Sequence, residues 1–542
     1  MSKLVEWEDS FFERDRLLPE HCLFFGFSES LLLGFLKRQA VWHKECITVF
    51  DNNPRKQGLH TISSSDLDGI DLSVHVCVYS YLELPRILAD LPMASVQFII
   101  LDDYFEEVYK NISRQILEVG LQDHLYENSI YYYPSLETSY MLSYRKKYSS
   151  TPLQDMILFR SGPHATQYVK GMDYADNARA LFEYMLAQGL DSKYELVWLV
   201  KNPEEYRDLA EDYENVSLIA FDWSTSDDAE EREKYYRALY LSKWIFMTDA
   251  YGFCRLPRTG QVRVQLWHGC GFKTRVNFVP CEKRYEYNVV VSDAYRKIHA
   301  DIYGLREDQV LITGYPKEDR LFHPMSGWQE IFGIPQAKKY IFWMPTFRKA
   351  QAQLKNLDME APEDETGLPV LESAKDLAAV NEILKEADAC LVIRLHPFQD
   401  ASAIHADGYS NIILMDNEIV EEQHLDINAI LGNADALISD YSSAAVDYMI
   451  LDRPMAFTID DVEAYESGRG FVFHPLRDYL PGVLIRNAED FQNFVADFLS
   501  GKDEGKNRRE KLMKTFHSFR DDRSSERVLK ALGIECVKHI GE

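Results

Sequence analysis

The chain has 542 residues, enough for about three domains of roughly 100 to 200 residues each, so a single small module is excluded. Hydrophobic residues make up 46% of the sequence and charged residues 27%, which is ordinary for a globular protein. The 59 lysines and arginines are outnumbered by 87 aspartates and glutamates, and the net charge of −28 argues against a general nucleic-acid binder or a uniformly cationic membrane-surface protein.

Short β-branched or aromatic runs alternate with amphipathic segments along the whole chain, a pattern typical of parallel sheets covered by helices. In residues 1–150 these runs are CLFF, ITVF, VHVCV and VQFII. The first run leads into Gly26 without the G-x-G-x-x-G fingerprint of a dinucleotide site. We therefore predict an N-terminal Rossmann-like accessory domain, with a functional dinucleotide site as the less favoured alternative.

Two further units of the same kind follow. Residues 151–316 contain MILFRS, YELVWLV, NVSLIAF, WIFMTDA, VRVQLW and NVVVSDAY, and residues 317–542 contain KYIFWM, ACLVIRL, NIILMD, ALISD and PMAFTID. Two consecutive doubly wound units favour the GT-B architecture, an α/β fold in which two Rossmann-like domains face each other across a cleft. We predict this fold for residues 151–542, with the accessory domain preceding it.

Polar residues gather directly after several of these strand-like runs. In open parallel sheets, ligands bind outside the carboxyl ends of the strands. The candidates are His268, Gly269 and Lys273 after VRVQLW, Arg348 after IFWM, Arg394 and His396 around the end of LVIRL, and Asp440, Ser442 and Ser443 around the end of ALISD. Cationic and hydroxyl groups at several strand ends predict a site for a polyanion between the two domains.

Ser442 and Ser443 stand where a strand is followed by the helical segment AAVDYMILD. A helix N-terminus offers unpaired N–H groups and a positive dipole end, so it can bind phosphate together with hydroxyl groups. Considered alone, one serine would more simply cap the helix. The cationic residues Arg348, Arg394 and His396 on neighbouring loops favour diphosphate binding instead.

His268 lies in a glycine-flanked loop, where an imidazole can stay partly exposed and titrate near neutral pH, as a general base requires. A structural histidine hydrogen-bonded to a loop carbonyl is the alternative, and the same ambiguity holds for His396. Cys270 has Lys273 nearby but no paired base in the sequence, so we reject a nucleophilic cysteine.

The cysteines and the N-terminus favour a cytoplasmic location. The eight cysteines are scattered, without a C-x-x-C pair or zinc-ligand spacing. Residues 1–15 lack the apolar segment of a signal peptide, and no stretch approaches the roughly 20 apolar residues of a spanning helix. We therefore expect any work at a membrane to take place at its inner face.

Five short motifs occur in the order QLWHGCGFK, MPTFR, RLHP, SDYSS and RGF, and they resemble those of the CDP-glycerol glycerophosphotransferases of teichoic-acid synthesis. The resemblance covers residues from about 155 to 535. It implies a GT-B enzyme that transfers glycerol phosphate or ribitol phosphate from a CDP-alditol to a lipid-linked acceptor at the inner face of the cell membrane. Attack on the β-phosphorus would release CMP, and no cofactor is implied.

The resemblance also assigns roles to residues. It implies that His268 is the catalytic base and that His396 acts on the donor phosphates. Donor binding falls to Arg348, Arg394, Asp440, Ser442 and Ser443, while Gly269, Lys273 and Arg469 belong to acceptor-side or loop positions. We expect no metal, because Arg348, Arg394, His396 and the helix terminus supply positive potential, and because no D-x-D pair stands at a strand end of this region.

Two other functions would use the same fold. A GT-B glycosyltransferase would release a nucleoside diphosphate, and a non-catalytic assembly protein would not require both His268 and His396. The sequence does not decide whether the donor carries glycerol or ribitol, whether the enzyme is a primase or a polymerase, or whether the product is wall teichoic acid or capsule. The partner enzymes of polymer synthesis and the oligomeric state are also left open. Residues 502–530 hold ten Lys/Arg and six Asp/Glu, a net of +4, so either contact with anionic lipid or a solvated terminal helix is expected there.

Overall fold

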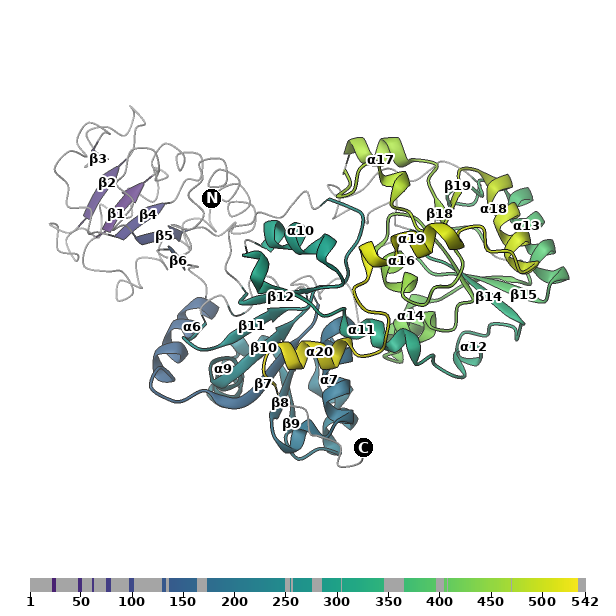
Figure 1. The fold of residues 1–542 in the computed structure, drawn as a ribbon. Helices are drawn as coiled ribbons and strands as arrows, with labels where there is room; N and C mark the ends of the chain where they lie inside the picture. Colours follow the sequence, from purple (N-terminus) through teal and green to yellow (C-terminus); the bar gives the residue numbers. More distant parts are fainter. Residues whose placement is uncertain are drawn as a thin grey trace.

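A computed structural model describes the strands within residues 22–132 and most of residues 136–534. The parts of 136–534 that are not described are 163–172, 249–253, 255–256, 275–284, 304, 346–364, 396–403, 407 and 469. The described strands form three parallel sheets, which confirms the predicted α/β class (Figure 1). No helix in the described part of the chain has the length and apolar character needed to cross a bilayer.

The first sheet comes from the N-terminal 150 residues and has the order β3-β2-β1-β4-β5-β6, which is also the strand order of dinucleotide-binding Rossmann folds. Gly26 and the loops around it lie outside the described residues, so the accessory domain and its alternative dinucleotide site stay predictions. The strands are β1 (Cys22–Phe25), β2 (Ile47–Phe50), β3 (Thr61–Ile62), β4 (His75–Val78), β5 (Gln97–Leu101) and β6 (Ser129–Tyr132).

The second sheet has the order β13-β12-β11-β10-β7-β8-β9, and the succession of strands reverses between β7 and β10. Strands β7, β8 and β10 are buried along almost their whole length, as expected for a parallel sheet covered on both faces. The strands are β7 (Gln154–Arg160), β8 (Glu195–Val200), β9 (Val216–Ala220), β10 (Ser242–Met247), β11 (Val262–Gln265), β12 (Tyr287–Val290) and β13 (Val310–Ile312). The helices of this unit are α6 (Leu136–Lys147), α7 (Asp176–Ala187), α8 (Asp208–Glu211), α9 (Ala229–Leu241) and α10 (Asp293–Tyr303).

The third sheet has the order β16-β15-β14-β17-β18-β19, with the reversal between β14 and β17. Ligands of such sheets bind at the carboxyl ends of the strands beside the reversal. The strands are β14 (Lys339–Trp343), β15 (Ala389–Ile393), β16 (Ile412–Leu414), β17 (Ala436–Ser439), β18 (Met455–Thr458) and β19 (Val483–Ile485). The helices are α12 (Trp328–Ile331), α13 (Ala374–Glu386), α14 (Asn417–Glu422), α15 (Ile427–Leu431), α16 (Ser443–Met449), α17 (Val462–Gly468) and α18 (Ala488–Leu499).

The units of the second and third sheets share one continuous apolar core. Phe272, which follows β11, packs its ring against Phe457 of β18 at 6.2 Å and against Phe516 of α19 (Lys506–Phe516) at 5.6 Å between ring centroids. Each predicted range, 1–150, 151–316 and 317–542, holds one sheet, whereas the exact boundaries stay predictions.

The last described helix returns to the second-sheet unit. Helix α20 (Ser524–Ala531) packs against α7 and against α11 (Pro316–Asp319), as Figure 1 shows. The carboxylate of Asp319 accepts hydrogen bonds from the backbone N–H groups of Ser524 and Ser525, each at 2.8 Å. The two larger units are therefore joined both at α11, where the chain first crosses between them, and at its end.

Candidate functional site

The loop after β11, residues 266–274, carries His268 at the carboxyl edge of the second sheet, and we call it the His268 loop. Trp267 has a φ of 51°, a left-handed conformation that is uncommon for a bulky residue and needs support from its surroundings. Asn177 of α7 supplies this support, because its Nδ2 donates to the carbonyl oxygens of Trp267 at 2.6 Å and Leu266 at 3.3 Å. These bonds fix the backbone from which the His268 side chain projects.

The imidazole of His268 is partly accessible, with 36% of its side chain exposed. Its Nδ1 lies 3.8 Å from Oδ2 of Asp176, the first residue of α7. Burial raises the pKa of Asp176, although the ammonium group of Lys317 opposes this shift. A carboxylate at this place favours a proton on Nδ1, which leaves Nε2 as the basic nitrogen. The arrangement is thus suited to a general base.

The turn between β17 and α16 has a capping serine, as its sequence indicates. Oγ of Ser442 accepts from the N–H of Ala444 at 3.3 Å, and the N–H of Ser442 donates to Oδ1 of Asp440 at 3.2 Å. Asp440 is fully buried and shapes this turn. Ser443 begins the helix. The N–H groups of Ala444 and Ala445 donate to Oγ and to the carbonyl oxygen of Ser442, so the N–H of Ser443 is the first-turn group that these bonds leave for an anion.

The His268 loop is in direct contact with the start of α16. A Cβ added at Gly269 would lie 3.0 Å from both Cβ and Oγ of Ser443, and a Cβ added at Gly271 would lie 3.4 Å from the same Cβ. Gly269 also has a φ of 144°, which residues with a side chain rarely adopt. The structure therefore brings the predicted base loop of one unit against Ser443, a predicted phosphate-binding residue of the other.

Arg394 directly follows β15, on the neighbouring part of the same sheet edge. Its backbone N–H donates to the carbonyl oxygen of Trp343 at 2.9 Å. Its Nε is buried without a hydrogen-bond partner among the residues that the structure describes, and burial lowers the pKa of its guanidinium to about 10. Because a buried polar group without a partner is unfavourable, an anionic ligand would be stabilising here.

Lys273 lies where the His268 loop pairs with the segment that contains the RGF motif. Lys273 and Phe471 form an antiparallel bridge, and the N–H of Thr274 donates to the carbonyl oxygen of Gly470 at 3.0 Å. Nζ of Lys273 lies 5.7 Å from the centroid of the Tyr465 ring. Sequence reasoning listed the two motifs separately, and it missed that they pair across the two units.

Three predicted site residues, Arg348, His396 and Arg469, lie outside the described residues, and their roles stay predictions. The described residues contain no group of three or more side chains that could hold a metal ion. The expected independence from metal also stays a prediction.

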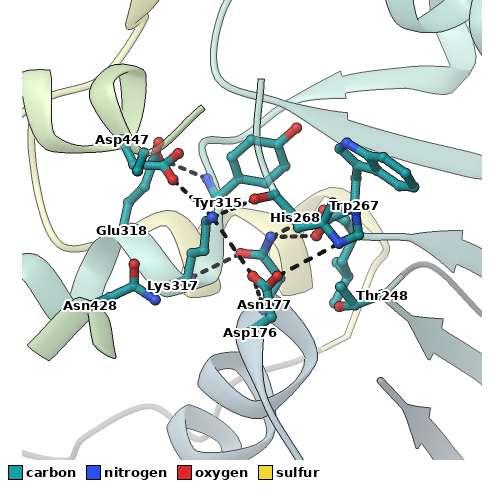
Figure 2. A network of polar contacts seen from close by, with 12 residues as sticks. Asp176, Asn177, Thr248, Trp267, His268, Tyr315, Lys317, Glu318, Asn428 and Asp447 are labelled. Carbon is teal, nitrogen blue, oxygen red and sulfur yellow. Dashed lines mark hydrogen bonds and ion pairs between the residues drawn. The ribbon is translucent and has the colours of Figure 1, made fainter. Parts of the chain in front are cut away.

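Sequence reasoning missed a polar network beside His268, which Figure 2 shows. Nζ of Lys317 lies 2.8 Å from Oδ2 of Asp447, and only 8% and 3% of these side chains are exposed. The sequence could have indicated that Asp447 belongs to the site, because it follows Ser443 by four residues and therefore lies on the same face of α16. No comparable signal relates Lys317 to Asp176 or Asn177, which are distant in the sequence.

Cys270 lies beside a histidine in the structure. The sequence had shown no base paired with this cysteine, which was our reason for rejecting it as a nucleophile. Its Sγ lies 3.6 Å from Nε2 of His299 and 3.2 Å from the Tyr315 hydroxyl, and Nδ1 of His299 lies 2.8 Å from Oδ1 of Asn288. Cys270 is fully buried, and burial raises the pKa of its thiol to about 12. The rejection therefore holds, because a buried neutral thiol is unreactive.

Comparison with known families and proteins agrees with the motifs. Residues 154–533 match the family described as CDP-Glycerol:Poly(glycerophosphate) glycerophosphotransferase. A teichoic acid ribitol-phosphate primase of Bacillus spizizenii is 27% identical, over 50% of this chain and 69% of its own length. A teichoic acid glycerol-phosphate transferase of Staphylococcus aureus is 25% identical, over 71% of this chain and 95% of its own length.

Solved structures of the wall teichoic acid polymerase TagF share the fold. One of them aligns with a TM-score of 0.54 and 19% identity, and the alignment covers 80% of this chain and 98% of that chain. Another was soaked with CDPG. Together with the two facing sheet units, this likeness confirms the predicted GT-B architecture.

Proposed function

Because the chain belongs to the CDP-glycerol:poly(glycerophosphate) glycerophosphotransferase family and transfers an alditol phosphate from a CDP-alditol, we propose that its acceptor is a hydroxyl group of a lipid-diphosphate-linked teichoic-acid or capsule-type polymer. The relatives include a ribitol-phosphate primase and a glycerol-phosphate transferase, so CDP-glycerol and CDP-ribitol are the two candidate donors. Family membership displaces the alternatives of a nucleotide-sugar glycosyltransferase and a non-catalytic assembly protein.

The observation that carries the proposed mechanism is the contact between the His268 loop and Ser443. It supports a reaction in which a partly exposed imidazole acts beside a helix terminus that holds a diphosphate. His268 takes the proton of the acceptor hydroxyl while the acceptor oxygen bonds to the β-phosphorus. The bond from this phosphorus to the oxygen shared with the α-phosphate breaks, and CMP leaves with that oxygen.

The donor phosphates are proposed to lie near the carboxyl ends of β14, β15 and β17, on both sides of the strand reversal. Arg394 supports this placement, because its buried Nε lacks a partner in the described part of the chain. Ser442, Ser443, Arg348 and His396 are the further proposed contacts. These groups supply positive potential without a metal, so enzyme treated with EDTA should keep substantial turnover; loss that one divalent ion restores would contradict this.

We further propose that the protein works at the inner face of the cell membrane, held mainly by its lipid-linked acceptor. Helix α19 adds a modest basic surface, since Lys506, Lys511 and Lys514 are exposed. Arg509 on the same helix does not contribute, because it is buried in ion pairs with Asp452 and Asp503 at 2.7 and 2.8 Å. Other enzymes of polymer synthesis are candidate partners, and nucleic acid is not.

The decisive experiment offers CDP-glycerol or CDP-ribitol with a lipid-diphosphate-linked glycan acceptor and measures released CMP. Acceptor-dependent CMP from one donor supports the proposal and identifies the alditol. A nucleotide sugar serves as the control donor. Absence of CMP with both CDP-alditols, or release of a nucleoside diphosphate from the sugar donor, would overturn it.

A further inference from the structure

Lys317 lies between the two segments that carry the proposed base and the proposed phosphate site. Its Nζ donates to the carbonyl oxygen of His268, lies 2.8 Å from Oδ2 of Asp447 on α16, and lies 3.8 Å from Oδ1 of Asp176 on α7 (Figure 2). A Cβ added at Gly269 would be 3.5 Å from the same Nζ. One ammonium group therefore contacts the His268 loop and a helix from each unit.

The backbone of Lys317 is tied to the same loop through Asn177. The N–H of Lys317 donates to Oδ1 of Asn177 at 3.0 Å, and Nδ2 of Asn177 donates to the carbonyl oxygen of Trp267. Lys317 belongs to α11, through which the chain passes from the second sheet to the third. The His268 loop is thus held at three consecutive carbonyl groups, two of them by Asn177 of α7 and one by Lys317 of the crossing segment.

The charges around Lys317 explain why its ammonium group stays protonated although it is buried. Burial alone would lower its pKa, but Asp447 and Asp176 together raise it above the ordinary value, so the side chain stays protonated. Burial raises the pKa of Asp447 to about 6 in spite of this partner. Loss of the ammonium group would leave Asp447 buried without a cation, which is strongly unfavourable.

We propose that Lys317 is a positioning residue that sets the distance between His268 and the start of α16. The proposal rests on the proposed role of His268 as the base. There is no room for a Cβ at Gly269 beside Ser443, so the loop lies close against the helix, and Lys317 prevents it from moving away. Proton transfer and phosphoryl transfer both depend on such distances, and a displacement of about 1 Å can lower a rate by about 100-fold.

The test compares Lys317→Met and Lys317→Arg in the full-length chain. Methionine keeps the length and removes the charge, so kcat for CMP release should fall about 10- to 100-fold while the affinity for CDP-alditol falls less. Arginine keeps the charge and the donors, so it should restore part of the lost kcat. Asp447→Asn should lower kcat as well, and the double variant should lose less than the product of the two single losses, because the residues act as a pair.

A matched control separates positioning from general stability. Arg509→Met also removes a buried cation from two carboxylates, because only 1% of the Arg509 side chain is exposed. One of these carboxylates belongs to Asp452, which follows the C-terminal end of α16, away from Ser443 at its start. Arg509→Met should lower the melting temperature and leave kcat of the folded enzyme nearly unchanged. The proposal is overturned if Lys317→Met keeps kcat within about twofold, or if its loss equals that of Arg509→Met at matched stability.

A structural readout keeps this test independent of the reaction. A crystal structure of Lys317→Met should show residues 266–269 displaced from Ser443, and an unchanged loop would overturn the proposal. If the wild-type chain released no CMP from any CDP-alditol, the proposed function would fail, and the position of this loop would still decide the role of Lys317.

Discussion

Gly269→Ala tests whether the His268 loop must lie as close to α16 as the structure shows. The added carbon would lie 3.0 Å from both Cβ and Oγ of Ser443, closer than such carbons normally approach. Rotation of the Ser443 side chain would relieve only the contact with Oγ, because Cβ is fixed by the backbone of the helix. The φ of 144° adds backbone strain, which for a residue in a sparsely populated region is about 1–3 kcal/mol.

We expect this substitution to affect turnover more than its effect on stability would suggest. The free energy of unfolding should fall by about 1–3 kcal/mol, which leaves a typical protein folded. The loop must also move away from Ser443 by several tenths of an ångström. Because a misplacement of about 1 Å can lower a rate by about 100-fold, kcat for CMP release should fall by about 10- to 100-fold. Urea unfolding and steady-state kinetics measure the two effects separately.

Gly271→Ala is the matched control in the same loop. Its added Cβ would meet the same Cβ of Ser443 at 3.4 Å, which is ordinary van der Waals contact, and its φ is not in the left-handed region. It should therefore retain near-normal kcat. Equal losses in the two variants, or normal turnover in Gly269→Ala, would refute the reasoning that close contact between the loop and α16 is required.

Three further outcomes follow from the site and its surroundings. His268→Ala should lower kcat by about 10²- to 10⁴-fold and leave donor affinity nearly intact, and a defect in donor affinity alone would contradict its role as the base. Ser443→Ala and Arg394→Ala should each weaken donor binding in calorimetry, and unchanged affinity in both would remove them from the phosphate site. Burial lowers the pKa of His517 to about 4. Near pH 6.5 only the unfolded chain therefore binds a proton at this imidazole, so the free energy of unfolding should fall by about 2 kcal/mol between pH 7 and pH 5. His517→Gln keeps a donor for the Val446 carbonyl and should remove this part of the pH dependence of urea unfolding, whereas an unchanged slope would contradict the shift.

The strands were predictable because both faces of a covered parallel sheet are apolar. The run ACLVI becomes β15, in which every residue is buried, and the residues that follow such runs fall at the carboxyl edge as expected. The serine turn was also predictable, since β17 leads directly into α16 and Ser442 caps that helix. Local pattern and a general rule of sheet topology were sufficient for these features.

The contacts between segments were not predictable from one sequence. Nothing in the local sequence of Lys317 indicates that its ammonium group meets Asp447, because that contact depends on how two separately folded sheets dock. The same holds for the antiparallel bridge between Lys273 and Phe471, which joins two motifs that appear unrelated along the chain. Reasoning from sequence therefore found the groups at the sheet edge but not the residues that hold the two edges together.

The return of α20 to the second-sheet unit has a consequence for the order in which the protein folds during synthesis. The helix buries Val528 and Leu529, and Nε of Arg527 donates to the carbonyl oxygen of Thr313 at 2.7 Å, directly after β13. Residues 154–312 leave the ribosome long before α20, so their unit stays without one of its covering helices until the third-sheet unit has also been synthesised. Premature termination within the third-sheet unit therefore also damages the unit that precedes it. For the same reason, a chimera that exchanges the second-sheet unit with that of a relative must take α20 from the same parent.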